Sequence, residues 1–323
     1  MFDQKFVRAA IDRSAENALD RRRFLRAAGI AGAVGAGAIA VGASPAAAHD
    51  DDDDHDEHDG RGKRPSDSAI LNFALNLEYL EAEFYLRAVT GAGLADNLLG
   101  GKGKRGVVTG GRQVNFQTPA IRQYAREIAG DEVAHVTFLR AALGGAAVAE
   151  PDISLDAAFA AAAEAAGLGT GFDAFANETN FLLAAFIFED VGVTAYKGAA
   201  PLIDNKTYLE AAAGILAVEA YHAANIRTAL VAQGLQTPSA MIFQTVQAIS
   251  DLRDGVDNTQ DVDQGIGTAD EINIVPTDMN GIAFSRSPGD VLNIVYLTPK
   301  KARKGGFYPS GVNGRLNTSS KLS

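Results

Sequence analysis

The chain has 323 residues, 47% of them hydrophobic, and a formal net charge of −11 at pH 7. This acidity argues against non-specific nucleic-acid binding, which needs basic patches, and against anionic membrane surfaces. Cysteine is absent, which excludes disulfides and thiolate metal sites. Any metal must be held by His and carboxylate, ligands that suit iron or manganese.

Residues 1–48 are typical of a twin-arginine export signal. The segment 20–26 (Asp-Arg-Arg-Arg-Phe-Leu-Arg) resembles the signal motif, a Gly- and Ala-rich apolar run follows at 27–43, and three alanines at 46–48 offer a cleavage site. The run is short for a bilayer span, which needs about 20 residues. We therefore expect cleavage, a periplasmic or otherwise extracytoplasmic protein, and no stable membrane insertion afterwards.

Residues 49–65 form an acidic, His-rich linker. His49 precedes five aspartates, and His55 and His58 lie among further acids. Such a run can bind divalent metal loosely. Because nothing fixes its geometry, we interpret it as a solvated linker, with metal scavenging as the alternative.

Four segments with helical spacing of apolar residues follow. The first begins near Ser66 and ends at Gly91, and the second runs from Thr118 to Gly144. A long connection with a short helix at 156–166 precedes a third helix, at about 173–197, and a fourth, at about 206–233. This layout predicts an all-α four-helix bundle with one long crossover, which we assign to residues 66–236.

Residues 237–323 are predicted to form a mostly irregular C-terminal extension. Residues 240–252 fit a fifth helix, and the rest is rich in Gly, Asn, Asp, Ser and Pro. The short apolar run within 290–297 fits a strand or an edge packed on the bundle. The sequence assigns no function to this extension.

Two Glu-x-x-His pairs carry the strongest chemical signal. Glu132 and His135 lie on the second helix, and Glu219 and His222 lie on the fourth. Residues three apart share a helix face, and both pairs continue the apolar stripe of their helix. A charged group at a core position is costly unless it is paired or bound to metal. Both pairs are therefore predicted to point into the core.

The other two helices each carry a Glu with a Tyr seven residues later, on the same face: Glu78 with Tyr85, and Glu189 with Tyr196. The chain thus reads as two hairpins with the same order of groups, which a pseudo-twofold axis would bring together. Four carboxylates can neutralise two divalent ions, and some can bridge them. The tyrosine hydroxyls could hydrogen-bond to ligating carboxylates. The pattern predicts a site for two Fe or two Mn ions per chain.

Other acids are interpreted from their place on the helix. Glu81 lies about 60° from Glu78 and is the rival ligand, whereas Glu83, about 140° away, is predicted to face solvent. On the second helix, Glu127 and Asp131 are interpreted as surface charges.

These motifs resemble those of a known superfamily. Residues 76–78 (Asn-Leu-Glu) with Tyr85 resemble the first metal-binding helix of ferritins, and the two Glu-x-x-His pairs resemble the second helix of ferritins and the fourth helix of bacterioferritin-like proteins. The stretches 75–85 and 177–196 are similar to the desiccation-related ferritin-like family, as are, loosely, 305–309 and 311–314. The resemblance implies a ferritin-like bundle whose metal ligands are Glu78, Glu132, His135, Glu189, Glu219 and His222.

Two functional hypotheses follow. The first is a di-iron or di-manganese oxidoreductase, ferroxidase- or catalase-like, whose partners are metal ions and oxygen, peroxide or ferrous iron. The second is a non-catalytic desiccation- or stress-related envelope protein with a structural or vestigial metal site. The tail and the export signal argue against iron storage in a ferritin cage. The choice of metal, the catalytic residues and a homo-oligomeric state stay open.

Overall fold

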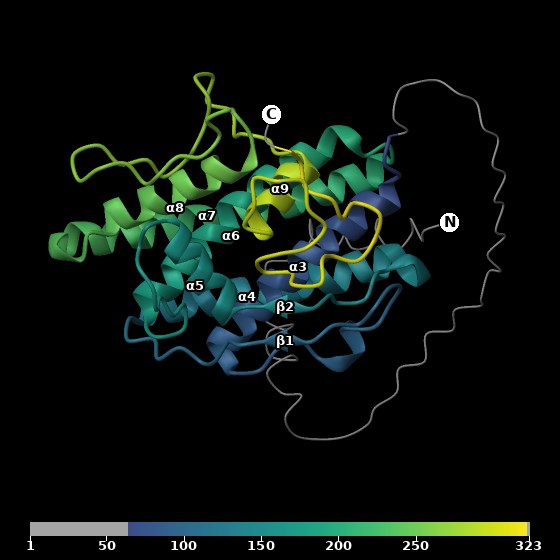
Figure 1. The fold of residues 1–323 in the computed structure, drawn as a ribbon, viewed down its shortest axis with the longest axis horizontal. Helices are drawn as coiled ribbons and strands as arrows, with labels where there is room; N and C mark the ends of the chain where they lie inside the picture. Colours follow the sequence, from purple (N-terminus) through teal and green to yellow (C-terminus); the bar gives the residue numbers. More distant parts are fainter. Residues whose placement is uncertain (1–63, 322–323) are drawn as a thin grey trace, which may run out of the picture. The chain divides into compact units, whose positions relative to one another are not determined.

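The computed structural model describes residues 64–321; the signal predicted at 1–48 and all but the end of the predicted linker lie outside them. Within this range, four long helices pair as two hairpins, α3 with α4 and α6 with α7, which contact each other through α3–α6 and α4–α7 (Figure 1). The arrangement confirms the all-α bundle with one long crossover. The helices are α3 (Asp67–Thr90), α4 (Pro119–Leu143), α6 (Glu178–Ala199) and α7 (Lys206–Gln236).

The helices begin and end where nearby groups satisfy their free backbone atoms. The Ser66 side chain accepts a hydrogen bond from the Ala69 N–H at the start of α3. Gly91 ends the helix with a φ of 81°, a left-handed conformation that glycine adopts readily. Helix α6 begins later than the predicted residue 173, because Asn177 accepts the Asn180 N–H and caps the first turn there.

The crossover between the hairpins carries α5 (Asp156–Ala165) and a pair of two-residue strands. β2 (Ile153–Ser154) pairs in parallel with β1 (Val108–Thr109), which lies in the α3–α4 connection. Helix α5 directs Phe159 against Phe84 of α3, with ring centroids 5.3 Å apart. The crossover is thereby tied to both the strand pair and the bundle core.

The C-terminal extension packs onto the bundle and contains two helices, α8 (Ile242–Asp257) and α9 (Pro288–Val295). A strand or edge at 290–297 is therefore wrong. Ser287 and Asp290 form a reciprocal capping box, and Pro288 favours the first helical turn. Beyond α9, in the segment drawn in yellow across α3 in Figure 1, the Tyr308 hydroxyl donates to the Asn76 carbonyl at 2.6 Å.

A buried network of arginines and aspartates joins the extension to the bundle. Arg253 of α8 contacts Asp190 of α6 at 2.9 Å and Asp263 at 2.6 Å. Arg227 of α7 also contacts Asp190, at 2.8 Å, and Arg286 contacts Asp263. Removing one partner would leave an uncompensated buried charge. The network therefore holds α6 in place through Asp190, the residue next to Glu189. None of the helices within residues 64–321 is both long and apolar enough to cross a bilayer.

Candidate metal centre

The six sequence-predicted ligands meet in the middle of the bundle. Each comes from the inward face of one of the four long helices, and each is at most 7% exposed. The two carboxylates on α3 and α6 face the two Glu-x-x-His pairs on α4 and α7. The six side chains fall into two overlapping groups that could each hold a metal ion: Glu78, Glu132, His135 and Glu219; and Glu132, Glu189 and His222.

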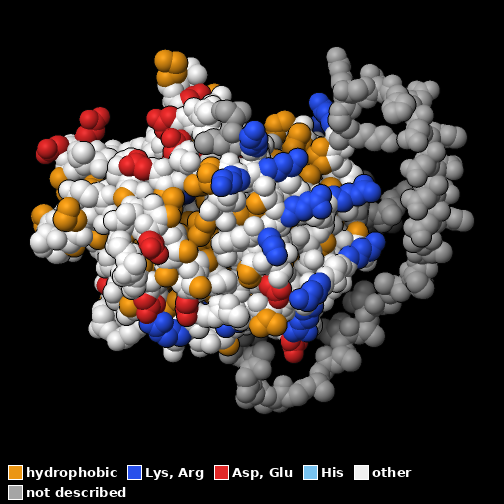
Figure 2. All heavy atoms as spheres, viewed as in Figure 1, with side chains coloured by type: hydrophobic (Ala, Val, Ile, Leu, Met, Phe, Trp, Pro, Cys, Tyr) orange, Lys and Arg blue, Asp and Glu red, His pale blue; other side chains and the backbone are white. Residues whose placement is uncertain are grey.

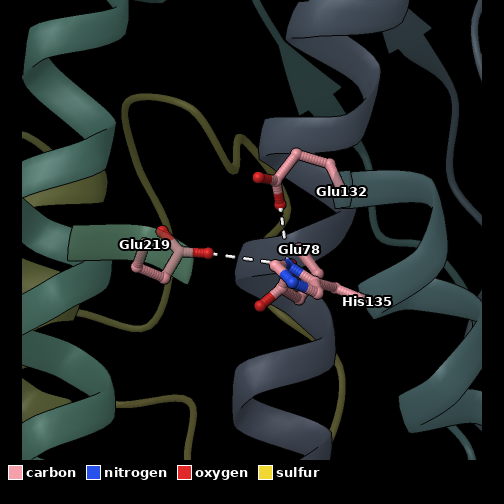
Figure 3. Close-up of side chains that lie close together, drawn as sticks. All are labelled: Glu78, Glu132, His135 and Glu219. Carbon is pink, nitrogen blue, oxygen red and sulfur yellow. Dashed lines mark hydrogen bonds and ion pairs between the residues drawn. The ribbon is translucent and has the colours of Figure 1, made fainter. Parts of the chain in front are cut away.

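The first group surrounds the His135 imidazole. Its Nδ1 lies 3.1 Å from Glu78 Oε2, 3.4 Å from Glu132 Oε2 and 3.6 Å from Glu219 Oε1. Figure 3 shows these carboxylates converging on the imidazole from α3, α4 and α7. Three different helices thus supply donors to one point, as a core metal site requires.

The second group surrounds the His222 imidazole. Its Nδ1 lies 3.1 Å from Glu132 Oε1 and 3.5 Å from Glu189 Oε2. Glu132 belongs to both groups, because one of its oxygens faces His135 and the other faces His222. A carboxylate shared in this way is the kind of ligand that bridges two metals.

Two tyrosine hydroxyls orient the carboxylates of α3 and α6. Tyr85 donates to Glu189 Oε1, and Tyr196 donates to Glu78 Oε1. Each tyrosine therefore donates to the glutamate of the opposite hairpin. The sequence showed only that each tyrosine shares a helix face with the glutamate of its own helix. The remaining oxygens, Oε2 of Glu78 and Oε2 of Glu189, face the imidazoles.

Asp131 is a site residue that the sequence interpretation missed. Its Oδ2 lies 3.1 Å from Nε2 of His222, so it bonds the imidazole on the side away from the cluster. The interpretation of Asp131 as a surface charge is wrong for this reason. Carboxylates in this position fix the orientation and tautomer of a metal-ligating histidine. The contact spans α4 and α7, so it could not be read from either helix alone.

Glu81 adds a fifth buried carboxylate. Burial raises its pKa well above the usual value, and the neighbouring Glu132 and Glu78 raise it further. It is absent from both candidate ligand groups. The position three residues after Glu189 is Gly192, where a side-chain Cβ would come within 2.4 Å of Glu219 Oε2. A glycine at 192 therefore leaves the space that the Glu219 carboxylate occupies.

Glu83 is buried, which contradicts its predicted exposure. Its Oε1 accepts the Leu94 N–H at 2.7 Å, and its Oε2 lies 2.7 Å from Arg87 Nε. The loop after α3 folds back over this face of the helix, which an isolated helical wheel cannot show. Glu83 thus holds a loop and takes no part in the cluster.

Burial and mutual repulsion favour protonated carboxyls in the cluster. Burial raises the pKa of Glu78 to about 7 and that of Glu219 well above its usual value. Burial works to raise the pKa of Glu132 too, but His135 and His222 outweigh it and lower the pKa. For His135 burial acts in the opposite direction and lowers the pKa, because it disfavours the charged imidazolium. The nearby Glu78 and Glu132 outweigh this effect and raise the pKa of His135 well above its usual value. So many ionisable groups in one core are tolerable only with protons or bound cations.

Several side-chain oxygen and nitrogen atoms of the cluster, all of kinds that ligate metals, lack hydrogen-bond partners. They are both oxygens of Glu219, Glu132 Oε1, Glu189 Oε2 and His222 Nδ1. The last of these lies 3.1 Å from Glu132 Oε1, within ion-pair distance but without hydrogen-bond geometry. Buried polar atoms are normally satisfied, so these lone pairs fit ligands of a cation. A set of carboxylates and imidazoles suits iron or manganese.

Comparison with known proteins agrees with this geometry. The model of the ferritin-like domain family matches residues 66–232. The desiccation-related protein PCC13-62 of Craterostigma plantagineum is 31% identical over 265 residues, which cover 77% of this chain and 84% of that protein. The ferritin-like catalase Nec2 of Nesocodon mauritianus is 29% identical over 273 residues, which cover 80% and 87%. No solved structure matches the chain.

Proposed function

The chain belongs to the ferritin-like domain family, and we propose that it is a two-metal oxidoreductase that disproportionates hydrogen peroxide in stress protection. The observation that carries this proposal is the pair of buried ligand groups sharing Glu132, with unpartnered donor atoms in both. The name of the relative Nec2, a ferritin-like catalase, favours peroxide over ferrous iron as the substrate.

The ligands would be divided between two ions. One would be held by the group around His135 and the other by the group around His222, with Glu132 common to both. Iron or manganese in these positions would supply the reversible electron transfer that converts two peroxide molecules into two water molecules and one oxygen molecule. Which of the two metals is bound stays open, because both accept this donor set.

The chain's own residues orient the ligands and hold protons. The Tyr85 and Tyr196 hydroxyls fix one oxygen of Glu189 and one of Glu78, which leaves the second oxygen of each directed at an imidazole. The reaction forms water from peroxide and so needs a proton to move between oxygen atoms. Glu81 is a buried carboxyl beside the cluster and outside both ligand groups, and burial raises its pKa, which favours the protonated form that could take part in this transfer.

A substitution of the shared ligand tests the proposal. We expect the purified chain to contain two iron or manganese ions and to release oxygen from peroxide. Glu132→Ala removes a donor from both groups, so we expect it to lose metal and to lower turnover at least about a hundredfold. Elemental analysis and an oxygen electrode measure the two effects. Glu164→Ala, an exposed position on α5, is the matched control.

Two outcomes would count against the proposal. Unchanged turnover in Glu132→Ala would place the reaction elsewhere. Two tightly bound metals in the unaltered chain without any peroxide turnover would favour the alternative of a non-catalytic stress protein, which the name of the desiccation-related relative supports. We further propose export through the twin-arginine route; its support is the motif at 20–26 with the small residues at 46–48.

A further inference from the structure

Within residues 64–321, two stretches that are rich in Lys and Arg contain no acidic residue. They are residues 97–126 and 291–321. The segment 251–278 has the opposite charge, because Arg253 is its one basic residue among many acids. The net charge of −11 therefore hides a strong separation of charge along the chain.

The fold brings the two acid-free stretches together. The Lys104 N–H donates to Asn313 Oδ1 at 3.3 Å, and the Asn313 side-chain amide donates back to the Lys104 carbonyl at 2.9 Å. Asn313 is also anchored to α3, because its own N–H donates to Asn76 Oδ1 at 3.0 Å. The loop before β1 and the segment after α9 are thus fixed side by side.

Six exposed basic side chains, drawn from the two stretches, form one surface, which we call the basic face. Figure 2 shows Lys and Arg gathered over the C-terminal segment and the loop before β1, with Asp and Glu mostly at the opposite side, over α8 and the loop that follows it. One member of the face, Lys104, has an acid nearby, because Asp152 Oδ2 lies 3.5 Å from its Nζ. The six members are Lys102, Lys104, Lys301, Arg303, Lys304 and Arg315.

The chemistry of this face fits a plane of anionic lipid headgroups. Lysine predominates, and its ammonium acts as a point charge that accepts many geometries, whereas structured phosphate recognition favours the arginine fork. Val107, next to Lys104 and Arg105 in the chain, is 67% exposed and offers apolar contact at the headgroup boundary. The aromatic rings of the C-terminal segment, Tyr296, Phe307 and Tyr308, are buried and unavailable for stacking on nucleic-acid bases.

We propose that the basic face docks the protein peripherally on membrane surfaces rich in anionic lipid. Attraction at such surfaces depends on the charges within a Debye length and not on the net charge of the molecule. The acidic side then orients the molecule with α8 away from the membrane. This proposal does not rest on the metal centre, which lies inside the bundle.

Vesicle co-sedimentation of the full chain tests the proposal. The vesicles contain phosphatidylcholine, either alone or with about one-third phosphatidylglycerol, and salt is varied from low to high. We expect binding to the anionic vesicles only, weakening as salt rises. Lys301→Gln with Lys304→Gln should weaken binding roughly 25-fold, because each basic residue near the surface contributes about fivefold.

The matched control changes two charges outside the basic face, near the C-terminal end of α3. Arg112 lies in the loop beyond the C-terminal end of α3, and Arg126 is exposed on α4. Arg112→Gln with Arg126→Gln alters the net charge equally, and we expect near-normal binding. Equal loss in both double variants, binding to pure phosphatidylcholine, or capture of soluble polyuronate or DNA with no vesicle binding would each overturn the proposal.

Discussion

The two helix hairpins carry the same groups in the same order, but their surroundings differ. Glu78 and Tyr85 on one hairpin correspond to Glu189 and Tyr196 on the other, and the tyrosine hydrogen bonds cross between the hairpins in both directions. The symmetry ends beyond these groups. Glu81 corresponds to Gly192, three residues after the α3 and α6 glutamates.

A second asymmetry concerns the two imidazoles. His222 is supported by Asp131, the residue that precedes Glu132. The residue that precedes Glu219 is Val218, which has no polar side chain to offer His135. The inner ligands are thus repeated, whereas the residues that support them are not. We infer that the two metal positions differ in affinity and in access to protons, and three substitutions can test how far they differ.

The largest effect is expected from Gly192→Ala. The new Cβ would lie 2.4 Å from Glu219 Oε2, far inside van der Waals contact, and would displace that carboxylate from the group around His135. We expect the loss of about one metal per chain and a fall in peroxide turnover of about a hundredfold, because small misplacements of ligands have effects of this size. Elemental analysis and oxygen release measure both quantities.

Gly214→Ala on α7 is the control for the change of residue type. A Cβ at Gly214 would meet no atom within 4 Å, and alanine within a helix is more stable than glycine by roughly 0.5–1 kcal/mol. Full metal content in Gly192→Ala would show that Glu219 is not a ligand, and would leave its burial unexplained.

The bundle itself could be predicted from the sequence because its signals are local. The apolar stripes, the caps at Ser66 and Gly91 and the Glu-x-x-His spacing each lie within a few turns of one helix. The helix α9 could not be separated from a strand, because its apolar run is short and both structures suit it. Its capping box at Ser287 was the signal that could have decided the matter.

The surroundings of the cluster could not be predicted, because they depend on contacts between distant segments. Asp131 meets His222 across 91 residues, and Glu83 is covered by the loop that carries Leu94. The reason for a glycine at position 192 appears only beside Glu219 of the neighbouring helix. Spacing within one helix therefore identifies the inner ligands and misses what supports them.

A smaller effect is expected from Asp131→Ala. Losing the carboxylate on Nε2 frees the His222 ring to rotate and lowers its basicity, so the affinity of the group around His222 should fall about 10- to 100-fold. The group around His135 should keep its metal. Competition with a chelator, followed by metal analysis, would then show one ion per chain that is removed more easily than in the unaltered protein and one that is removed as before.

Asp131→Asn separates orientation from charge in this test. The amide oxygen can still accept a hydrogen bond from Nε2, so we expect a smaller loss than with alanine. Equal weakening of both ions in Asp131→Ala would contradict the division into two unequal positions.

The smallest effect concerns Glu81 and the pH dependence of the metal-free protein. Burial, with Glu132 and Glu78 nearby, raises the pKa of this carboxyl well above 4.5. The folded state therefore keeps a proton that the unfolded state releases, so the stabilisation is complete below pH 4.5 and is lost as the pH rises. Glu81→Gln is neutral at every pH and should not show this loss. After chelation, we expect both proteins to melt alike at pH 5, and the variant to melt about 2–5 °C higher at pH 8.

A buried carboxyl outside the cluster does not confuse this comparison. Burial and the neighbouring Glu83 raise the pKa of Glu150 to about 8, which destabilises the folded state with rising pH in the same direction. Because Glu150 is present in both proteins, its contribution cancels in the difference between their melting temperatures. Glu164→Gln, at an exposed position, should match the unaltered protein at both pH values. If Glu81→Gln lost stability at pH 8 instead, Glu81 would be charged in the folded state and stabilised by a neighbouring imidazolium such as that of His222, and its role as a carboxyl that holds a proton would have to be abandoned.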